Sequence, residues 1–102
     1  MSEVVNKGDQ TIIRPGTDVV ASMAETFKAE LVSAIDASQG ELIIDLAGVE
    51  MVDSVGIGVI ISAHNTLHQS GRKLEVINVS TDVYSLFATM RLNRRFTVAQ
   101  AG

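Results

Sequence analysis

The chain has 102 residues, enough for one compact domain but too few for two domains that each bury a core of their own. Apolar residues make up 46% and charged residues 20%, which excludes a disordered chain, and the absence of cysteine excludes disulfides and zinc–thiolate sites. The formal net charge of -4 leaves no basic stripe for nucleic acid. We therefore predict a single domain over residues 1–102, with its core at about 10–98.

Residues 1–9 are polar and lack the apolar stretch of a signal peptide. The longest apolar run, residues 55–61, contains two glycines and is far shorter than the roughly 20 residues that cross a bilayer. We therefore expect a cytoplasmic protein without membrane insertion.

Two short strands are predicted near the amino terminus. Residues 11–13 form a β-branched run that ends at Arg14-Pro15-Gly16, and Val19-Val20 form a second, shorter run. The interruption between them is typical of a turn.

The next predicted element is a helix over residues 23–37. Ser22, with Glu25 three residues later, matches a capping box, and Gly40 lies just beyond the predicted end. The apolar residues recur every four positions, at Met23, Phe27, Leu31 and Ile35.

The second half of the chain alternates strands and helices. Residues 42–46 are apolar on both faces except for Asp45, which is typical of a buried parallel strand. A helix over 55–70 and a strand over 73–79 follow, and the two strands should be parallel. Ser80 caps a last helix, and residues 96–98 form a short final strand.

The most unusual segment is Val52-Asp53-Ser54-Val55-Gly56-Ile57-Gly58. A dinucleotide fingerprint would need a third glycine where Ile61 stands, and no Gly-Lys-Ser/Thr follows to make a P-loop. A hydrolase elbow would need glycine in place of Val52. Two interpretations stay open: a phosphoacceptor serine at a helix amino terminus, or an ordinary helix cap with glycines for close packing.

The histidines do not supply a catalytic base to this segment. His64 and His68 follow Ser54 by ten and fourteen residues on the same predicted helix, roughly 15 and 21 Å along its axis. Their own spacing of four could chelate a metal, but no third ligand is indicated, so we expect no metal, no cofactor and no enzymatic activity.

The segment Asp53-Ser54-x-Gly56-x-Gly58, after Ile43-Ile44-Asp45-Leu46-x-Gly48-Val49, closely resembles the STAS family of anti-sigma factor antagonists. Ser70-Gly71-x-Lys73-Leu74 and Asn78-Val79-Ser80 extend the similarity, which covers roughly residues 10–98. The resemblance implies an α/β fold with a mixed sheet of four or five strands and helices packed on one face.

The resemblance also implies a function. Ser54 would be phosphorylated by a partner that is a GHKL-type serine kinase and often the anti-sigma factor itself, and a serine phosphatase would reset the cycle. The partner-binding residues would be Asp53, Ser54, Val55, Gly56, Ile57 and Gly58, with both glycines leaving room for the partner's approach.

One position departs from the family pattern. Many antagonists carry an acidic residue where this chain has Val19, with Asp18 one place earlier, which bears on the identity of the kinase. The alternative function is a STAS scaffold, or a subunit of a signalling or lipid-transport complex, that is never phosphorylated.

Three further features have structural interpretations. Asp45 is expected to organise the loop that follows its strand, and the methionines are expected to fill the core. The basic cluster of Arg91, Arg94 and Arg95 complements the carboxyl end of the last helix or contacts an acidic or phosphate group.

Overall fold

The structure is a computed structural model that describes residues 2–102, so Met1 of the predicted domain lies outside the described residues. The elements in chain order are β1 (Glu3–Lys7), β2 (Gln10–Arg14), α1 (Ala21–Ala37), β3 (Glu41–Asp45), α2 (Ser54–Gln69), β4 (Leu74–Val79), α3 (Thr81–Thr89), a 3-10 turn (Leu92–Arg94) and β5 (Thr97–Gln100).

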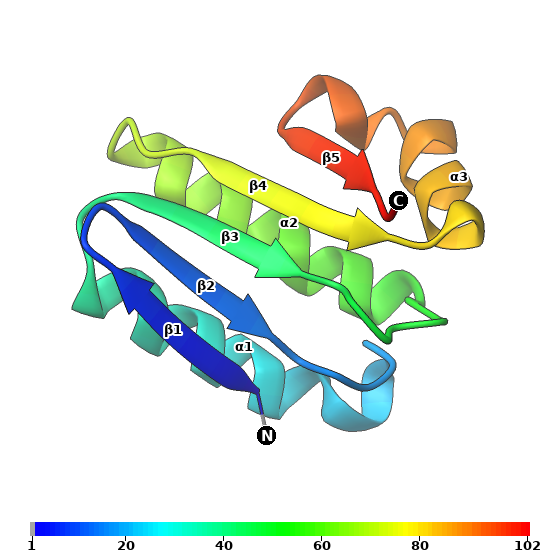
Figure 1. Cartoon of the computed structure of the whole chain (residues 1–102), viewed down its shortest axis with the longest axis horizontal. Coiled ribbons are helices and arrows are strands. Elements are labelled where there is room, and N and C mark those ends of the chain that lie inside the picture. Colours follow the sequence, from blue (N-terminus) through cyan, green and yellow to red (C-terminus); the bar gives the residue numbers. More distant parts are fainter. Residues whose placement is uncertain (1) are drawn as a thin grey trace.

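The five strands form one mixed sheet in the order β1-β2-β3-β4-β5 (Figure 1). β1 pairs with β2 in the antiparallel direction, and every later neighbour is parallel. The predicted parallel pairing of the strands on either side of α2 is confirmed, as is the α/β fold class with a mixed sheet.

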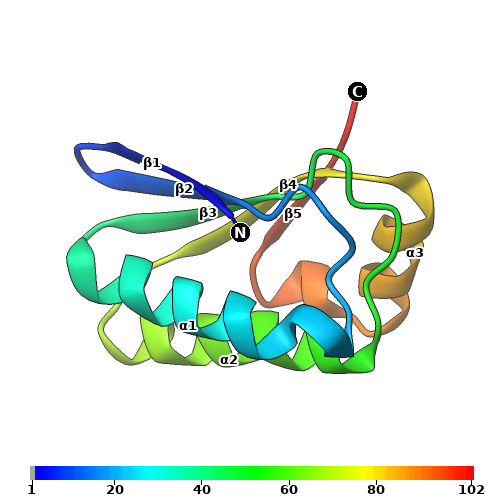
Figure 2. The ribbon, with the colours of Figure 1, turned by 90° about the horizontal axis from the view of Figure 1, so that it is seen from below.

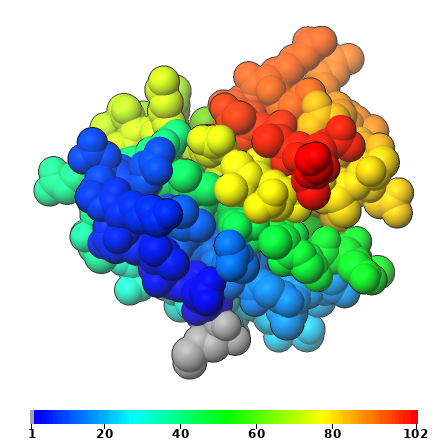
Figure 3. Space-filling view, in the orientation of Figure 1, coloured from blue at the N-terminus to red at the C-terminus, as the bar shows by residue number. Residues whose placement is uncertain are grey.

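α1 and α2 lie side by side against one face of the sheet, and α3 packs at the β5 end (Figure 2). The core fills the space between these two helices and the sheet, with fully buried Phe27, Leu31, Ile44, Ile60 and Leu67. Within residues 2–102 no helix covers the opposite face, which is turned to the viewer in Figure 3. None of the described helices has both the length and the apolar character needed to cross a membrane.

The amino-terminal strand β1 was not predicted. All five of its residues are exposed, so the hydrophobic alternation that marks a half-buried strand is absent. Its order comes from a hairpin, in which Lys7 pairs with Gln10 across a two-residue turn and Gly8 takes a positive φ of 63°. Glycine adopts that backbone conformation without the steric cost that a Cβ brings.

The prediction of a strand at Val19-Val20 is wrong. Val19 forms an isolated parallel bridge with Val52, and Val20 is already the residue that precedes α1. The capping box is wrong as well, because α1 begins at Ala21 and Ser22 lies inside its first turn.

The remaining elements confirm the predictions with ends shifted by one or two residues. α2 begins at Ser54 rather than residue 55, and β5 extends to Gln100 rather than residue 98. Ser80 caps α3 as expected, since its hydroxyl oxygen accepts the N–H of Val83 at 3.3 Å. A helix cap of this kind can be predicted from sequence because the two groups that it joins are only three residues apart.

Candidate functional site

Ser54 is the first residue of α2, and its side chain is exposed. The helix starts at this point because Asp53 is an N-cap, with extended backbone and a carboxylate oxygen, Oδ1, that accepts the N–H of Gly56 at 2.9 Å. The serine therefore stands at the beginning of a capped helix, in the first turn, where backbone N–H groups point outward.

The second carboxylate oxygen of Asp53 is also occupied. Oδ2 accepts the N–H of Ala21 at 2.9 Å, so a single side chain joins the amino termini of α1 and α2. The bonds from the N–H groups of Gly56 and Ala21 lower the pKa of Asp53 below its ordinary value. The carboxylate next to Ser54 is thus ionised at neutral pH and held in place from two helices.

Asp18 makes a matching contact in the opposite direction. Its Oδ1 accepts the N–H groups of Glu50 and Met51, at 3.0 and 3.1 Å, and so ties the segment that leads into α1 to the segment before α2. From sequence, Asp18 stood out only as the acidic residue one place before Val19, where the chain departs from the family pattern. A side chain that bonds to backbone 32 and 33 residues away leaves no local signal.

Gly56 is buried, and the space around it is already occupied. A Cβ at this residue would lie 2.1 Å from the carbonyl oxygen of Val19 and 2.9 Å from its carbonyl carbon. The expectation that both glycines leave room for a partner is therefore wrong for Gly56, which lets α2 approach the chain before α1. Gly58 has nothing within 4 Å of such a Cβ and is exposed.

The six residues expected to contact a partner divide between surface and interior. Ile57 is 2% exposed and belongs to the core, whereas Val55 is 47% exposed beside Ser54. Met51 is 57% and Met90 46% exposed, so the prediction that the methionines fill the core is wrong for both. We call the accessible group, Met51, Ser54, Val55 and Gly58, the Ser54 surface.

Asp45 is buried at the end of β3 and fixes the start of the loop that leads to Ser54. Its Oδ1 accepts the N–H of Ala47 and the side-chain amide of Asn78, both at 2.9 Å. Its Oδ2 accepts from Arg14 Nη2 at 2.8 Å and Nε at 3.1 Å. Burial alone would raise the pKa of Asp45, but the bonds from Asn78, Arg14 and Ala47 outweigh it and lower that pKa. The expected structural role is confirmed.

The histidines lie at the other end of α2 from Ser54. The ring of His64 is 5.3 Å from the ring of Phe96, which precedes β5, and 5.6 Å from the ring of His68. Among residues 2–102 there is no group of three or more His, Cys, Asp or Glu side chains arranged to hold a metal ion. At the start of α2 an exposed serine, Ser54, lies next to an aspartate whose two carboxylate oxygens both accept hydrogen bonds and close to the exposed apolar side chains of Met51 and Val55. This combination is suited to contact with a protein surface.

The sequence was compared with models of known protein families. The sequence profile of the STAS domain matches residues 2–101. The chain belongs to the STAS domain family. The predicted resemblance is thus confirmed, and no curated protein sequence matches the chain.

Several proteins of known structure share its fold. An anti-sigma factor antagonist from Mycobacterium paratuberculosis superimposes with a TM-score of 0.85 at 16% identity, covering 97% of this chain and 84% of that one. The anti-sigma factor antagonist SpoIIAA in its unphosphorylated form gives 0.80 at 18% identity, covering 98% and 89%. The murine anion transporter Slc26a9 gives 0.79 at 18% identity, but the match covers 96% of this chain and only 17% of the transporter. The STAS fold therefore occurs both in antagonists and within a transporter.

Proposed function

We propose that this STAS domain is a phosphorylation-controlled protein-binding switch of the anti-sigma factor antagonist type, and that it is not an enzyme. In the unphosphorylated form it binds an anti-sigma factor that is also a GHKL-type serine kinase. The kinase phosphorylates Ser54, the complex dissociates, and a serine phosphatase restores the binding form.

The observation that carries the proposal is the position of Ser54 itself. Its side chain is exposed in the first turn of α2, while Asp53 on one side and Gly56 on the other are held by contacts to α1 and the chain before it. A kinase can reach such a hydroxyl, and a partner meets a turn that is already rigid. The similarity to SpoIIAA, whose structure is of an unphosphorylated form, supports the same interpretation.

The exposed apolar side chains of Met51 and Val55 explain why phosphorylation would act on binding. A partner that covers them removes water from the Ser54 surface. A phosphate on Ser54 adds about -1.5 to -2 charges beside the ionised Asp53, and these charges must then be desolvated in the interface. One like-charge contact at about 5 Å and an effective dielectric of about 20 costs about 3 kcal/mol, which is more than a hundredfold in affinity.

The same phosphate should leave the domain folded. It stands at the amino terminus of α2, where the helix dipole favours negative charge by about 0.3–1 kcal/mol. The core residues under this turn, such as Ile57, do not contact the added group because the Ser54 side chain points into solvent.

The test is titration calorimetry of three proteins against the GHKL-type kinase: wild type, Ser54→Ala and protein carrying phosphoserine at residue 54. We expect equal affinity for the first two and at least a hundredfold loss for the third, with unchanged circular dichroism. Ser22→Ala is the matched control for phosphorylation, since Ser22 is also an exposed serine in the first turn of a helix. The kinase should modify Ser22→Ala and spare Ser54→Ala.

Equal binding of phosphorylated and unphosphorylated protein would refute the switch. Tight binding that ignores the state of Ser54 would instead favour the alternative function, a STAS scaffold or complex subunit.

A further inference from the structure

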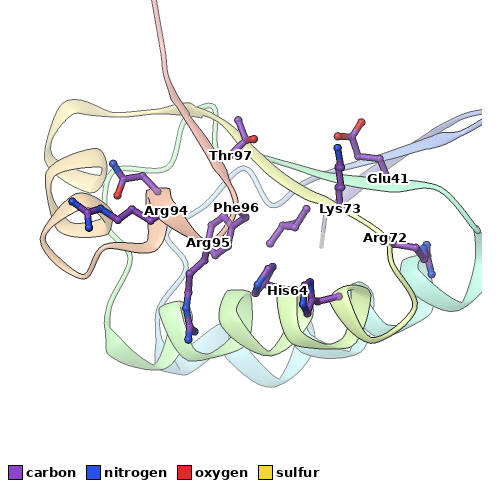
Figure 4. Close-up of a pocket in the computed structure, with 11 residues that line it drawn as sticks. Glu41, His64, Arg72, Lys73, Arg94, Arg95, Phe96 and Thr97 are labelled. Carbon is purple, nitrogen blue, oxygen red and sulfur yellow. The ribbon is translucent and has the colours of Figure 1, made fainter.

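A second region with its own chemistry lies at the opposite end of α2. A hollow of about 390 Å³ opens between the carboxyl-terminal half of α2, the start of β4 and the segment that leads into β5 (Figure 4). Its volume falls in the range typical of small-ligand sites. His64 stands ten residues after Ser54, so the hollow is roughly 15 Å along the helix axis from the Ser54 surface.

The residues around this hollow carry a concentration of positive charge. Four of the chain's eight Lys and Arg residues line it, against one acidic residue, Glu41. The chain as a whole has a net charge of -4, so this region has the opposite sign to the rest of the molecule. The four basic residues are Arg72, Lys73, Arg94 and Arg95.

Most of this charge has no structural partner. In residues 2–102 both ion pairs are made by Arg14, which lies elsewhere, so Lys73, Arg94 and Arg95 have none. Glu41 is turned to β2, where its carboxylate accepts the side-chain amide of Gln10 at 2.8 Å. Unpaired cations that surround a hollow lower the cost of desolvating an anion there.

Arg72 is the exception among the four basic residues. It has a clear structural role, because its guanidinium donates to the carbonyl oxygens of Gly40 and Ile35 and to the hydroxyl of Ser38, at 2.9–3.0 Å. These bonds fix the wall of the hollow at the end of α1. The remaining cations are therefore the ones available to a ligand.

Arg95 and the two histidines line the hollow on the side of α2. Figure 4 shows the Arg95 side chain reaching from the β5 segment to α2 beside His64, while Arg94 points away from that group. Burial, the neighbouring His68 and the charge of Arg95 lower the pKa of His64. Its imidazole is therefore neutral at pH 7 in the empty hollow, and an anion bound beside Arg95 would favour its protonation.

We propose that this hollow binds a phosphomonoester dianion, held by Arg95, His64 and His68 with Lys73 at the rim. Guanidinium groups bind phosphate through paired N–H bonds, and a protonated imidazole adds a further donor and charge. The dianion belongs either to a small phosphorylated molecule or to a lipid headgroup. The proposal goes beyond the switch function and does not depend on Ser54.

The affinity test uses inorganic pyrophosphate and inorganic phosphate as probes, at constant ionic strength, by calorimetry. Arg95→Gln should weaken pyrophosphate binding at least tenfold. Arg91→Gln is the matched control, since Arg91 belongs to the same basic cluster and is exposed but does not line the hollow. Arg91→Gln and Ser54→Ala should bind as wild type does, which separates this proposal from the switch.

A second measurement follows the imidazoles by NMR titration between pH 5 and 8. Besides His68 on its own helix, Arg95 from the segment before β5 is the charged group that acts on His64. The other charged residues around the hollow are Arg94 on that same segment, Arg72 and Lys73 before β4, and Glu41 at the start of β3. Saturating pyrophosphate should raise the pKa of His64 by about one unit in wild type and by much less in Arg95→Gln.

Vesicles separate the two sources of the phosphate. Binding to phosphatidic acid vesicles but not to phosphatidylglycerol vesicles, with competition by pyrophosphate, would assign the site to a lipid headgroup. Binding of pyrophosphate without vesicle binding would assign it to a soluble phosphorylated molecule. Equal binding by Arg95→Gln and wild type, equal loss in Arg91→Gln, or no binding of either probe or vesicle would overturn the proposal.

Discussion

Gly56 and Gly58 lie two residues apart in α2, and replacing each by alanine should change the stability of the domain in opposite directions. Gly56→Ala places a methyl group where the carbonyl oxygen of Val19 already lies, 2.1 Å from the new carbon. Gly58→Ala places it in open space on an exposed face of the same helix. Both variants gain the same helix propensity, so their difference isolates the cost of the close approach at Gly56.

The loss of stability in Gly56→Ala can be worked out from the parts of the chain that must move apart. The obstacle at Gly56 is backbone, so the first turn of α2 and the chain at Val19 must separate by about 1 Å to restore ordinary contact, an overpacking cost of about 1–3 kcal/mol. The separation also strains the bonds from Asp53 N–H to Val19 O, at 3.2 Å, and from Val19 N–H to Met51 O, at 2.9 Å, each worth about 1 kcal/mol.

Replacing glycine by alanine inside a helix returns about 1 kcal/mol, so the net loss for Gly56→Ala is about 2–3 kcal/mol. Gly58→Ala should stabilise the domain by about 0.5–1 kcal/mol. For a chain of this size these values correspond to a decrease in Tm of about 10–20 °C for Gly56→Ala and an increase of a few degrees for Gly58→Ala.

The assay is urea and thermal unfolding of the wild type and both variants, followed by circular dichroism at one protein concentration. A Gly56→Ala protein as stable as wild type would refute the account of Gly56 as a contact point between α2 and the chain before α1. A Gly58→Ala protein that loses more than about 1 kcal/mol would refute the assignment of Gly58 to open surface.

Two aspartates give further predictions. The pKa of Asp45 is lower in the folded chain than its ordinary value of 3.8, so its ionised form stabilises the fold above about pH 4 and this contribution is lost as the pH falls through the folded pKa. Asp45→Asn should therefore cost about 2 kcal/mol at pH 7, and its deficit in unfolding free energy should shrink below pH 4, whereas a deficit independent of pH would contradict the charge-based account. Asp18→Ala should speed amide hydrogen exchange at Glu50 and Met51 at least tenfold, and Asp36→Ala, on the exposed side of α1, should leave both unchanged; unchanged protection in Asp18→Ala would show that the loop does not need this clamp.

The candidate site was partly predictable because some of its signals are local. Asp53 caps a helix whose first N–H groups lie within three residues, so the start of α2 near Ser54 could be predicted from sequence. Asp45 stood out as a polar residue in an apolar strand, and its need for hydrogen-bond partners followed from burial. The family resemblance depended on the same short segments.

The remaining features were decided by contacts between distant parts of the chain. α1 begins at Ala21 because Asp53, 32 residues later, accepts its N–H group, whereas the local capping box at Ser22 is unused. Gly56 was expected to belong to a partner-binding surface. It is instead a packing residue, because α2 contacts the chain at Val19 at this point.

The sequence by itself determined the amphipathic helices, the buried central strands, the capped helix start at Ser54 and the family, because those signals depend on residues a few positions apart. Only the tertiary structure decided that β1 is a strand, since its order comes from pairing with β2 rather than from its own pattern. It also decided that Arg95, His64 and Lys73 surround one hollow, since they come from three segments that meet at one end of the sheet. The pairing of β1 with β2 and the meeting of three segments around the hollow depend on contacts between residues far apart in the chain. A local sequence pattern therefore cannot predict them.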